Sequence, residues 1–80
     1  MGESDITQRL TGIFRAVLGS DGLVITRELR AGDIRQWDSI SHVMLIAEIE
    51  KDFSITFKLK DLSRMQCVGD MIEVIAAKLG

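Results

Sequence analysis

The chain contains few of the side chains that form covalent cross-links or metal sites. Its 80 residues include a single cysteine, Cys67, and a single histidine, His42. One cysteine excludes an internal disulfide and is typical of a protein from a reducing compartment. One cysteine and one histidine do not provide the ligand spacing of a zinc site, so we expect no metal centre.

No segment indicates a membrane anchor or an export signal. The first residues, MGESDI, contain no basic region followed by an apolar run, and position 6 is Ile where a myristoylated N-terminus has Ser or Thr. The apolar runs are too short to span a bilayer. A net charge of −2 gives no general field that would attract nucleic acid or an anionic membrane. We therefore expect a cytoplasmic protein that neither binds nucleic acid nor spans a membrane.

Apolar residues recur at helical spacing near both ends of the chain. The first set is Ile6, Leu10, Ile13, Phe14, Val17 and Leu18, and the last is Val68, Met71, Ile72, Ile75, Ala76 and Leu79. Each set follows one face of an α-helix. We expect Ser4 or Asp5 to cap the first helix and Gly19 to end it.

A third apolar pattern predicts a helix over about 38–52. Its core face is formed by Leu45, Ile46, Ile49 and Phe53, which lie within one arc of about 100°. A short helical turn is expected over 59–63. The stretch SITFKL before it alternates like a strand, but a single strand has nothing to pair with.

Residues 19–37 show no sustained period, although five apolar side chains are spread through them: Leu23, Ile25, Leu29, Ile34 and Trp37. We expect these side chains to hold an ordered, partly buried loop, with room for a short helical turn. The sequence therefore predicts an all-α fold, a small antiparallel bundle of three main helices plus one short helix with a long first loop. Its length predicts a single domain over 1–80.

Ser39 and His42 are three residues apart and could suggest a catalytic pair. Nucleophilic catalysis also needs a third group that orients the base, and donors aimed at the developing oxyanion. Asp38 directly precedes the serine and cannot easily orient the far nitrogen of the imidazole. We therefore interpret His42 as a hydrogen-bonded, partly buried side chain on the core side of its helix, and we expect no catalytic residues.

Two other polar features also have structural interpretations. Arg27, Arg30 and Arg35 alternate with Glu28 and Asp33, with no aromatic platform, which indicates a solvated, salt-bridged loop and not a nucleic-acid site. Cys67 precedes an apolar helix and is interpreted as a small buried residue, not as an activated thiol.

Asp38 and Ser39 by themselves predict only the capped start of a helix, because both residue types are common there. The helix that follows carries a second apolar stripe, Ile40, Met44 and Ala47, roughly opposite its core face. Scattered exposed apolar residues are normal, but an apolar patch beside a hydroxyl indicates a docking surface. An anion attached at Ser39 would also lie at the positive end of the helix dipole.

Three segments, in this order and in a chain of this length, resemble the acyl carrier proteins and related phosphopantetheine carriers. WDSI is similar to the D-S-L motif of that family, IAEIEKDFSITF to the segment that follows it, and CVGDMIEVI to the start of the last helix, usually T-V-G-D. The resemblance covers nearly the whole chain.

The resemblance implies that Ser39 is esterified to 4′-phosphopantetheine, which a separate Mg²⁺-dependent phosphopantetheinyl transferase takes from coenzyme A. The thiol of this arm would carry an acyl or aminoacyl group as a thioester. The carrier would catalyse nothing and would act as a monomer that presents the group to loading and condensing enzymes. Asp38 and Ile40, which flank the motif serine, would help the transferase and the partners to recognise the site.

The sequence departs from the family pattern at a few positions. Carriers for fatty-acid synthesis usually have acids just after the motif serine, and the matching residues here are Ser41 and Met44. Cys67 replaces the usual Thr, a better cap, so we expect slight fraying there. These departures favour a specialised discrete carrier, for polyketide, peptide or surface-polymer biosynthesis, over a housekeeping fatty-acid carrier. An unmodified helical protein-interaction domain of the same shape is the alternative outside the carrier class.

Overall fold

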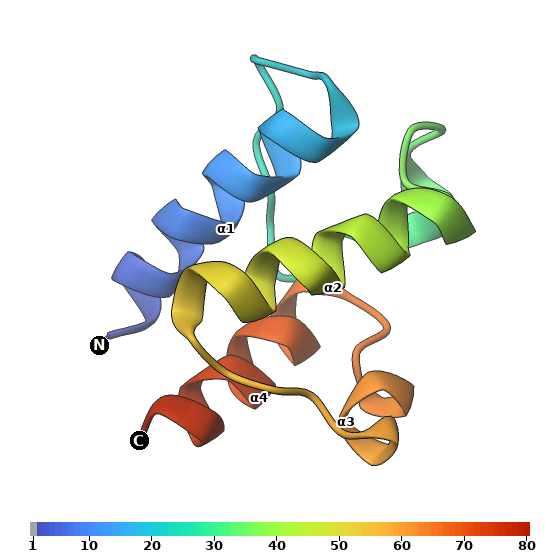
Figure 1. The fold of residues 1–80 in the computed structure, drawn as a ribbon. Helices are drawn as coiled ribbons and strands as arrows, with labels where there is room; N and C mark the ends of the chain where they lie inside the picture. The colour runs from blue at the N-terminus through green and yellow to red at the C-terminus, as the bar shows by residue number, and fades with distance from the viewer. Residues whose placement is uncertain (1) are drawn as a thin grey trace.

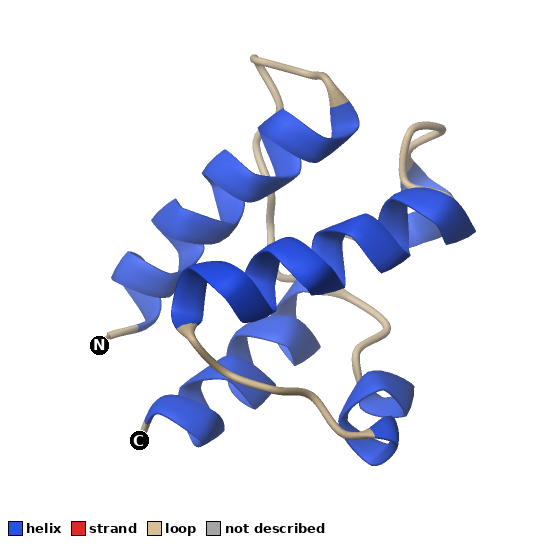
Figure 2. Ribbon diagram, in the orientation of Figure 1, coloured by secondary structure: helices blue, strands red, loops and turns tan. Residues whose placement is uncertain are grey.

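The computed structural model describes residues 2–80, and the regular structure within them is helical (Figure 1). The elements are α1 (Glu3–Leu18), the 3-10 turn η1 (Ala31–Asp33), α2 (Ser39–Phe53), α3 (Leu59–Arg64) and α4 (Val68–Leu79). Figure 2 shows loops between the helices and no strand in the described residues, where a single antiparallel bridge joins Arg30 and Cys67. The predicted all-α fold, with three main helices, one short helix and a long first loop, is confirmed.

The three main helices pack around one interior. α1 packs against both α2 and α4 and runs in the opposite direction to them (Figure 1). α3 lies to one side, within the connection that leads along the chain from α2 to α4 (Figure 1). The start of α2 lies on the side of the molecule opposite to both chain ends (Figure 1).

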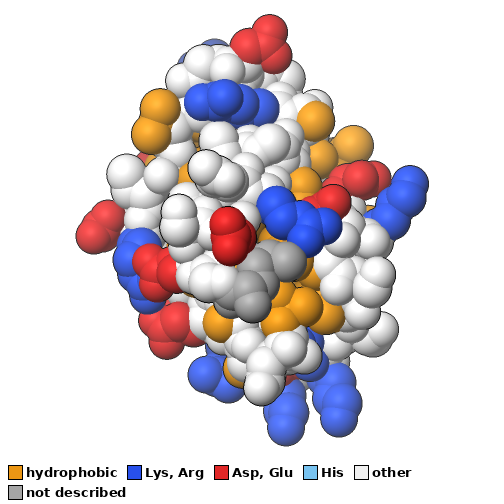
Figure 3. Space-filling model, turned by 90° about the vertical axis from the view of Figure 1, so that its left-hand side faces the viewer, with side chains coloured by type: hydrophobic (Ala, Val, Ile, Leu, Met, Phe, Trp, Pro, Cys, Tyr) orange, Lys and Arg blue, Asp and Glu red, His pale blue; other side chains and the backbone are white. Residues whose placement is uncertain are grey.

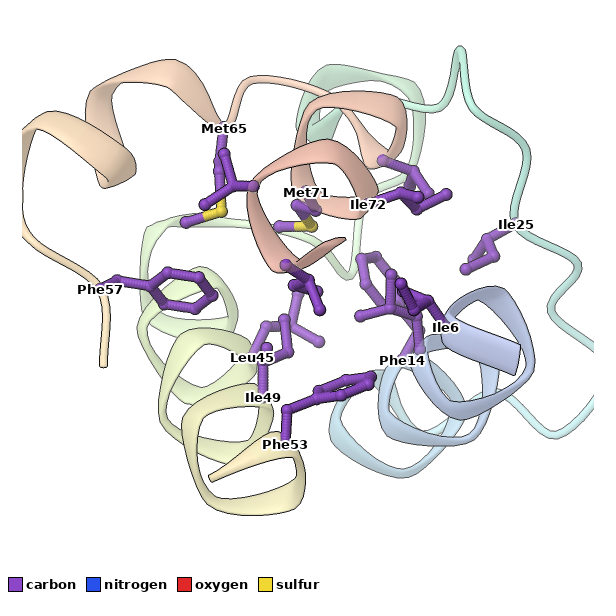
Figure 4. Packing of buried hydrophobic residues seen from close by; sticks show 14 of the residues in the cluster. Ile6, Phe14, Ile25, Leu45, Ile49, Phe53, Phe57, Met65, Met71 and Ile72 are labelled. Atoms are coloured by element: carbon purple, nitrogen blue, oxygen red, sulfur yellow. The ribbon is translucent and has the colours of Figure 1, made fainter. Parts of the chain in front are cut away.

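The core takes apolar side chains from every main helix and from the connections between them. Its buried members are Ile6, Leu10, Phe14, Leu18, Ile25, Trp37, Leu45, Ile49, Phe53, Phe57, Met65, Val68, Met71, Ile72, Val74 and Ile75. Figure 4 shows how side chains of α1, α2 and α4 meet, with Phe57 and Met65 entering from the segments before and after α3. The core faces predicted for α1 and α2 are thus confirmed, with Ile13, Val17 and Ile46 only partly buried.

The prediction for the start of α1 is wrong, whereas that for its end is confirmed. The helix begins at Glu3, its N-cap residue is Gly2 without a side-chain cap, and Ser4 and Asp5 lie inside the first turn. The backbone N–H of Ile6 donates to the carbonyl of Gly2 at 3.1 Å. Starting here puts Ile6, which is fully buried, within a complete turn, and the acids of that turn suit the helix dipole. At the other end Gly19 adopts the left-handed conformation (φ 67°) that ends the helix.

The buried face of α4 differs from the predicted one at two positions. Ala76 is exposed, whereas Val74 is buried. Val74 lies beside Lys58 and Asp61 of the α3 region, so the short helix covers a side of α4 that the periodic pattern alone assigns to solvent. The position of α3 is held by Asp61, whose carboxylate accepts from the Lys58 N–H at 2.8 Å and pairs with the Lys78 ammonium at 2.8 Å. The hydrogen bond from Lys78 is the main cause that lowers the pKa of Asp61 below its ordinary value.

The long first connection is ordered, as predicted. Ile25 and Trp37 are buried, and Leu23, Leu29 and Ile34 pack against the core. The guanidinium of Arg15 in α1 also donates to the Leu23 carbonyl at 2.8 Å.

This connection also holds the start of α4. Cys67, the N-cap residue, provides no side-chain cap. Instead, the N–H of Val68 donates to the Leu29 carbonyl at 3.0 Å, and that of Gly69 donates to the Arg27 carbonyl at 2.9 Å. The loop backbone thus accepts from the first N–H groups of the helix, which the Cys67 side chain does not cap.

Charged side chains link the loop to two helices. Arg27 pairs with Glu3 of α1 at 2.8 Å and with Glu73 of α4 at 2.7 Å, so its acidic partners come from helices and not from neighbouring loop residues. The charge of Glu3 is the main cause that raises the pKa of Arg27 above its ordinary value. On the face that carries the chain ends, basic and acidic side chains are interspersed (Figure 3).

Replacing Gly69 by Ala should lower the free energy of unfolding by about 1 kcal/mol. A Cβ atom at this position would lie 3.1 Å from the Arg27 carbonyl oxygen, which cannot easily retreat because it accepts the N–H of the same residue. Overpacking of this kind costs roughly 1–3 kcal/mol, against a gain in helix propensity of up to about 1 kcal/mol. Urea denaturation followed by the fluorescence of Trp37 measures the change.

Gly12→Ala is the matched control, because no atom lies within 4 Å of the added Cβ on α1. This variant should raise the free energy of unfolding by about 0.5–1 kcal/mol. Equal stabilisation by the two substitutions would show that the contact between Gly69 and the loop is not tight.

Candidate functional site

The start of α2 is fixed by Asp38, as predicted. Its carboxylate accepts a hydrogen bond from the backbone N–H of Ser41 at 2.9 Å. This bond is the main cause that lowers the pKa of Asp38 below its ordinary value, so the side chain is ionised at neutral pH. The first turn of the helix therefore already has one negative charge at its N-terminus.

Two serines lie in this turn, and only one has an uncommitted hydroxyl. The Ser41 hydroxyl donates to the Gln36 carbonyl at 2.7 Å, and this residue is partly buried. Ser39 is exposed, and its hydroxyl has no hydrogen-bond partner within residues 2–80. Of the two, Ser39 is thus the hydroxyl that an incoming reagent can reach without breaking a bond in the protein.

Trp37 anchors the loop just before this turn. Only 2% of its surface is exposed. Its ring packs edge to face with that of Phe14 in α1, with the centroids 5.0 Å apart and the planes at 88°. Its indole N–H donates to Nδ1 of His42 at 3.1 Å, and the two rings stack. One side chain therefore ties the end of the loop to α1 and to the first turns of α2.

The hydrogen bond from Trp37 determines the state of His42. An indole N–H can only donate, so Nδ1 accepts and the proton of the neutral imidazole lies on Nε2. Burial lowers the pKa of His42 below 6.5. The predicted hydrogen-bonded, partly buried imidazole is confirmed. It is not bonded to Ser39, so these two side chains do not form a nucleophile–base pair.

An open hollow of about 680 Å³ lies beside Ser39. Three segments bound it: η1 with the residue before it, the start of α2, and the segment after α3. Its lining residues are Arg30, Ala31, Gly32, Trp37, Asp38, Ser39, His42, Met65 and Gln66. The contribution of Arg30 and η1 was not predicted, because no local pattern relates these residues to a helix start several positions later.

The predicted second stripe of α2 is on the surface. Ile40 is 74% exposed, Met44 is 51% exposed, and Ala47 is also exposed. Val43, which is 68% exposed, belongs to the same surface. The spacing 40, 43, 44, 47 would have revealed it, since this is the i, i+3, i+4, i+7 pattern of one helix face. We call these four residues the α2 stripe.

The α2 stripe continues into a groove against α1. Met44 and Ala47 form one wall of this groove, and Gly12, Ile13 and Ala16 form part of the other. The groove has a volume of about 640 Å³ and carries charged side chains at its edge. The apolar surface beside the Ser39 turn is therefore wider than the predicted stripe.

Over residues 2–80 no three or more His, Cys, Asp or Glu side chains are placed so that they could hold a metal ion. None of the helices within that range is long and apolar enough to cross a membrane. Cys67 is only partly buried, whereas the sequence predicted a buried residue.

Comparisons with known proteins agree with the geometry. The chain is 30% identical over 76 residues to the acyl carrier protein of Thermotoga maritima, with 95% of this chain and 94% of that protein covered. A solution NMR structure of the holo acyl carrier protein from Geobacter metallireducens matches with a TM-score of 0.86 and 42% identity, covering 91% of this chain and 84% of that one. No family model matches the chain.

The state of His42 predicts how stability depends on pH. Since the pKa of His42 is lowered in the folded protein, the unfolded chain takes up the proton first as the pH falls through 6.5. The neutral His42 therefore contributes to the free energy of unfolding above pH 6.5, and this contribution is lost as the pH falls below 6.5. We expect His42→Asn, which keeps an acceptor for the Trp37 N–H but does not titrate, to lose less stability than the wild type between about pH 7.5 and about pH 5. Urea denaturation at several pH values measures both slopes; identical slopes would contradict the prediction.

Proposed function

This chain belongs to the acyl carrier protein family, and on that premise we propose that Ser39 carries a 4′-phosphopantetheine arm. The observation that carries the proposal is the Ser39 hydroxyl, exposed and without a hydrogen-bond partner in the described chain, next to Ser41, whose hydroxyl is bonded to Gln36. The arm supplies a thiol that holds an acyl or aminoacyl group as a thioester.

The residues around Ser39 fit such a group. The hydroxyl can form a phosphodiester without disturbing the helix, because the cap of α2 is made by Asp38 and not by Ser39. The adjoining hollow is open, and Ala31 and Gly32 leave space in it. Arg30 and the Nε2–H of His42 provide donors in its lining.

We propose a carrier and not an enzyme. On a separate phosphopantetheinyl transferase, the Ser39 oxygen would lose its proton and bond to the phosphorus that carries the pantetheine of coenzyme A, while the P–O–P bond breaks and adenosine 3′,5′-bisphosphate leaves. Loading and condensing enzymes would then receive the cargo from the arm. We propose that they recognise Asp38 and the α2 stripe, which borders the attachment point on its exposed side. We further propose that the carrier is a cytoplasmic monomer.

The surface of α2 supports a specialised role. Carriers with acids at the positions of Ser41 and Met44 can dock onto basic patches, but here one position is a serine bonded to the backbone and the other is an exposed apolar side chain. Docking through apolar contacts depends less on ionic strength than docking through charges. We propose a carrier for polyketide, peptide or surface-polymer biosynthesis; a housekeeping fatty-acid carrier is the alternative.

Incubation with coenzyme A, Mg²⁺ and a broad-range transferase should add the mass of one arm to the wild-type chain, as read by intact-mass measurement. Ser39→Ala should abolish the addition. Ser41→Ala is the matched control and should keep it, because this hydroxyl is used within the protein. An unmodified wild-type chain with several transferases would favour a helical interaction domain without an arm.

Met44→Glu should change the free energy of unfolding by less than about 1 kcal/mol, since the side chain is half exposed and surface substitutions have small effects. It should slow modification by the transferase several-fold, because a charge would enter the apolar α2 stripe. Val24→Glu is the control, at an exposed apolar residue of the first loop, and should leave the rate unchanged. A large loss of stability in Met44→Glu would show that the two faces of α2 are wrongly assigned.

A further inference from the structure

We infer that Arg30 binds the phosphate that joins the arm to Ser39 and thereby holds the first part of the arm in the hollow beside η1. This inference rests on the proposed function, since it requires a phosphodiester at Ser39. The inference adds Arg30, a residue of the first loop, to the site. The motif around Ser39 does not include this residue.

Arg30 differs in its partners from Arg9 and Arg27, and of the arginines it alone lines the hollow beside Ser39. Arg27 pairs with Glu3 and Glu73, and Arg9 pairs with Asp52. Within residues 2–80 the Arg30 guanidinium has no carboxylate partner; it donates to the neutral Oε1 of Gln66 at 3.3 Å. The nearby Asp33 carboxylate accepts from the backbone N–H of Arg30, at 2.9 Å, and not from its guanidinium. This cation is therefore exposed and not neutralised by an ion pair.

The surroundings of Ser39 call for a cation. A phosphodiester carries one negative charge, and at Ser39 it would lie next to the ionised carboxylate of Asp38. At the start of the helix, one of the unpaired N–H groups, that of Ser41, already donates to Asp38, which leaves fewer donors for the phosphate. Among the residues that line the hollow, Arg30 is the one with a permanent positive charge. Its planar guanidinium can donate two parallel hydrogen bonds to phosphate oxygens.

This arrangement directs the arm. Arg30, Ala31 and Gly32 form one wall of the hollow. Met65 and Gln66, which follow α3 in the chain, form another part of its lining. The α2 stripe faces away from the core, whereas Trp37 and His42 line the hollow. A phosphate held by Arg30 would place the arm in the hollow and leave the α2 stripe free for a partner.

The test compares loaded wild-type protein with Arg30→Gln, Arg30→Lys and Arg35→Gln, after intact-mass measurement has confirmed one arm on each. The ³¹P resonance of the phosphodiester should shift in Arg30→Gln and should be intermediate in Arg30→Lys, which keeps the charge but loses the planar fork. Arg35→Gln, at an exposed arginine that does not line the hollow, should match the wild type. In the wild type, exchange of the Arg30 Nε–H with water should slow several-fold on loading.

The outcomes separate this inference from the proposed function. If all four loaded proteins give the same ³¹P resonance and the Arg30 Nε–H exchanges equally fast with and without the arm, the phosphate lies in solvent and the inference is wrong, while the added mass still supports the carrier. If no arm is added to any protein, the proposed function fails and the inference fails with it.

Discussion

Trp37 lies against Phe14 of α1 and donates its indole N–H to His42 of α2, with almost none of its surface exposed. Asp38 and Ser39 follow it directly, so the side chain that closes the long loop also fixes where α2 begins. An edge-to-face aromatic pair with a satisfied N–H is a well-defined contact for this purpose. The place of the Ser39 hydroxyl, at the surface but next to a buried anchor, follows from it.

The first loop acts as a structural element and not as a tether. Its carbonyls at Arg27 and Leu29 accept from the first N–H groups of α4, and Arg27 joins α1 to α4 through two carboxylates. The bridge between Arg30 and Cys67 keeps η1 close to the start of α4. The same contacts that satisfy the backbone of α4 therefore bring Arg30 and Gly32 to the hollow beside Ser39. Stability and the shape of the site depend on one set of hydrogen bonds.

Helical periodicity was enough to predict α1, α2 and α4, because side chains such as Leu10, Leu45 and Ile75 repeat at the spacing that one buried face requires. Periodicity was not enough where a segment distant in the sequence determines which side chain is buried or how a helix start is held. Val74 is buried because α3 covers it, and the start of α4 is held by loop carbonyls that no local pattern reveals. Ser4 and Asp5 are good cap residues by type, but the helix begins at Glu3, so that the buried Ile6 lies within a complete turn. Asp38 and Ser39 predicted a cap from residue types alone; the carrier function came from the order of motifs along the chain.

In the first turn of α2, Asp38 makes the cap and Ser41 bonds to the loop, which leaves the Ser39 hydroxyl uncommitted, and we therefore propose Ser39 as the attachment point. The exposed apolar α2 stripe lies beside it, and we propose that partners dock there. The most direct measurement is tandem mass spectrometry of the loaded wild-type chain, which assigns the added mass to a single residue. The account predicts that the fragment masses place the arm on Ser39; an arm on Ser41 or on any other residue would contradict it.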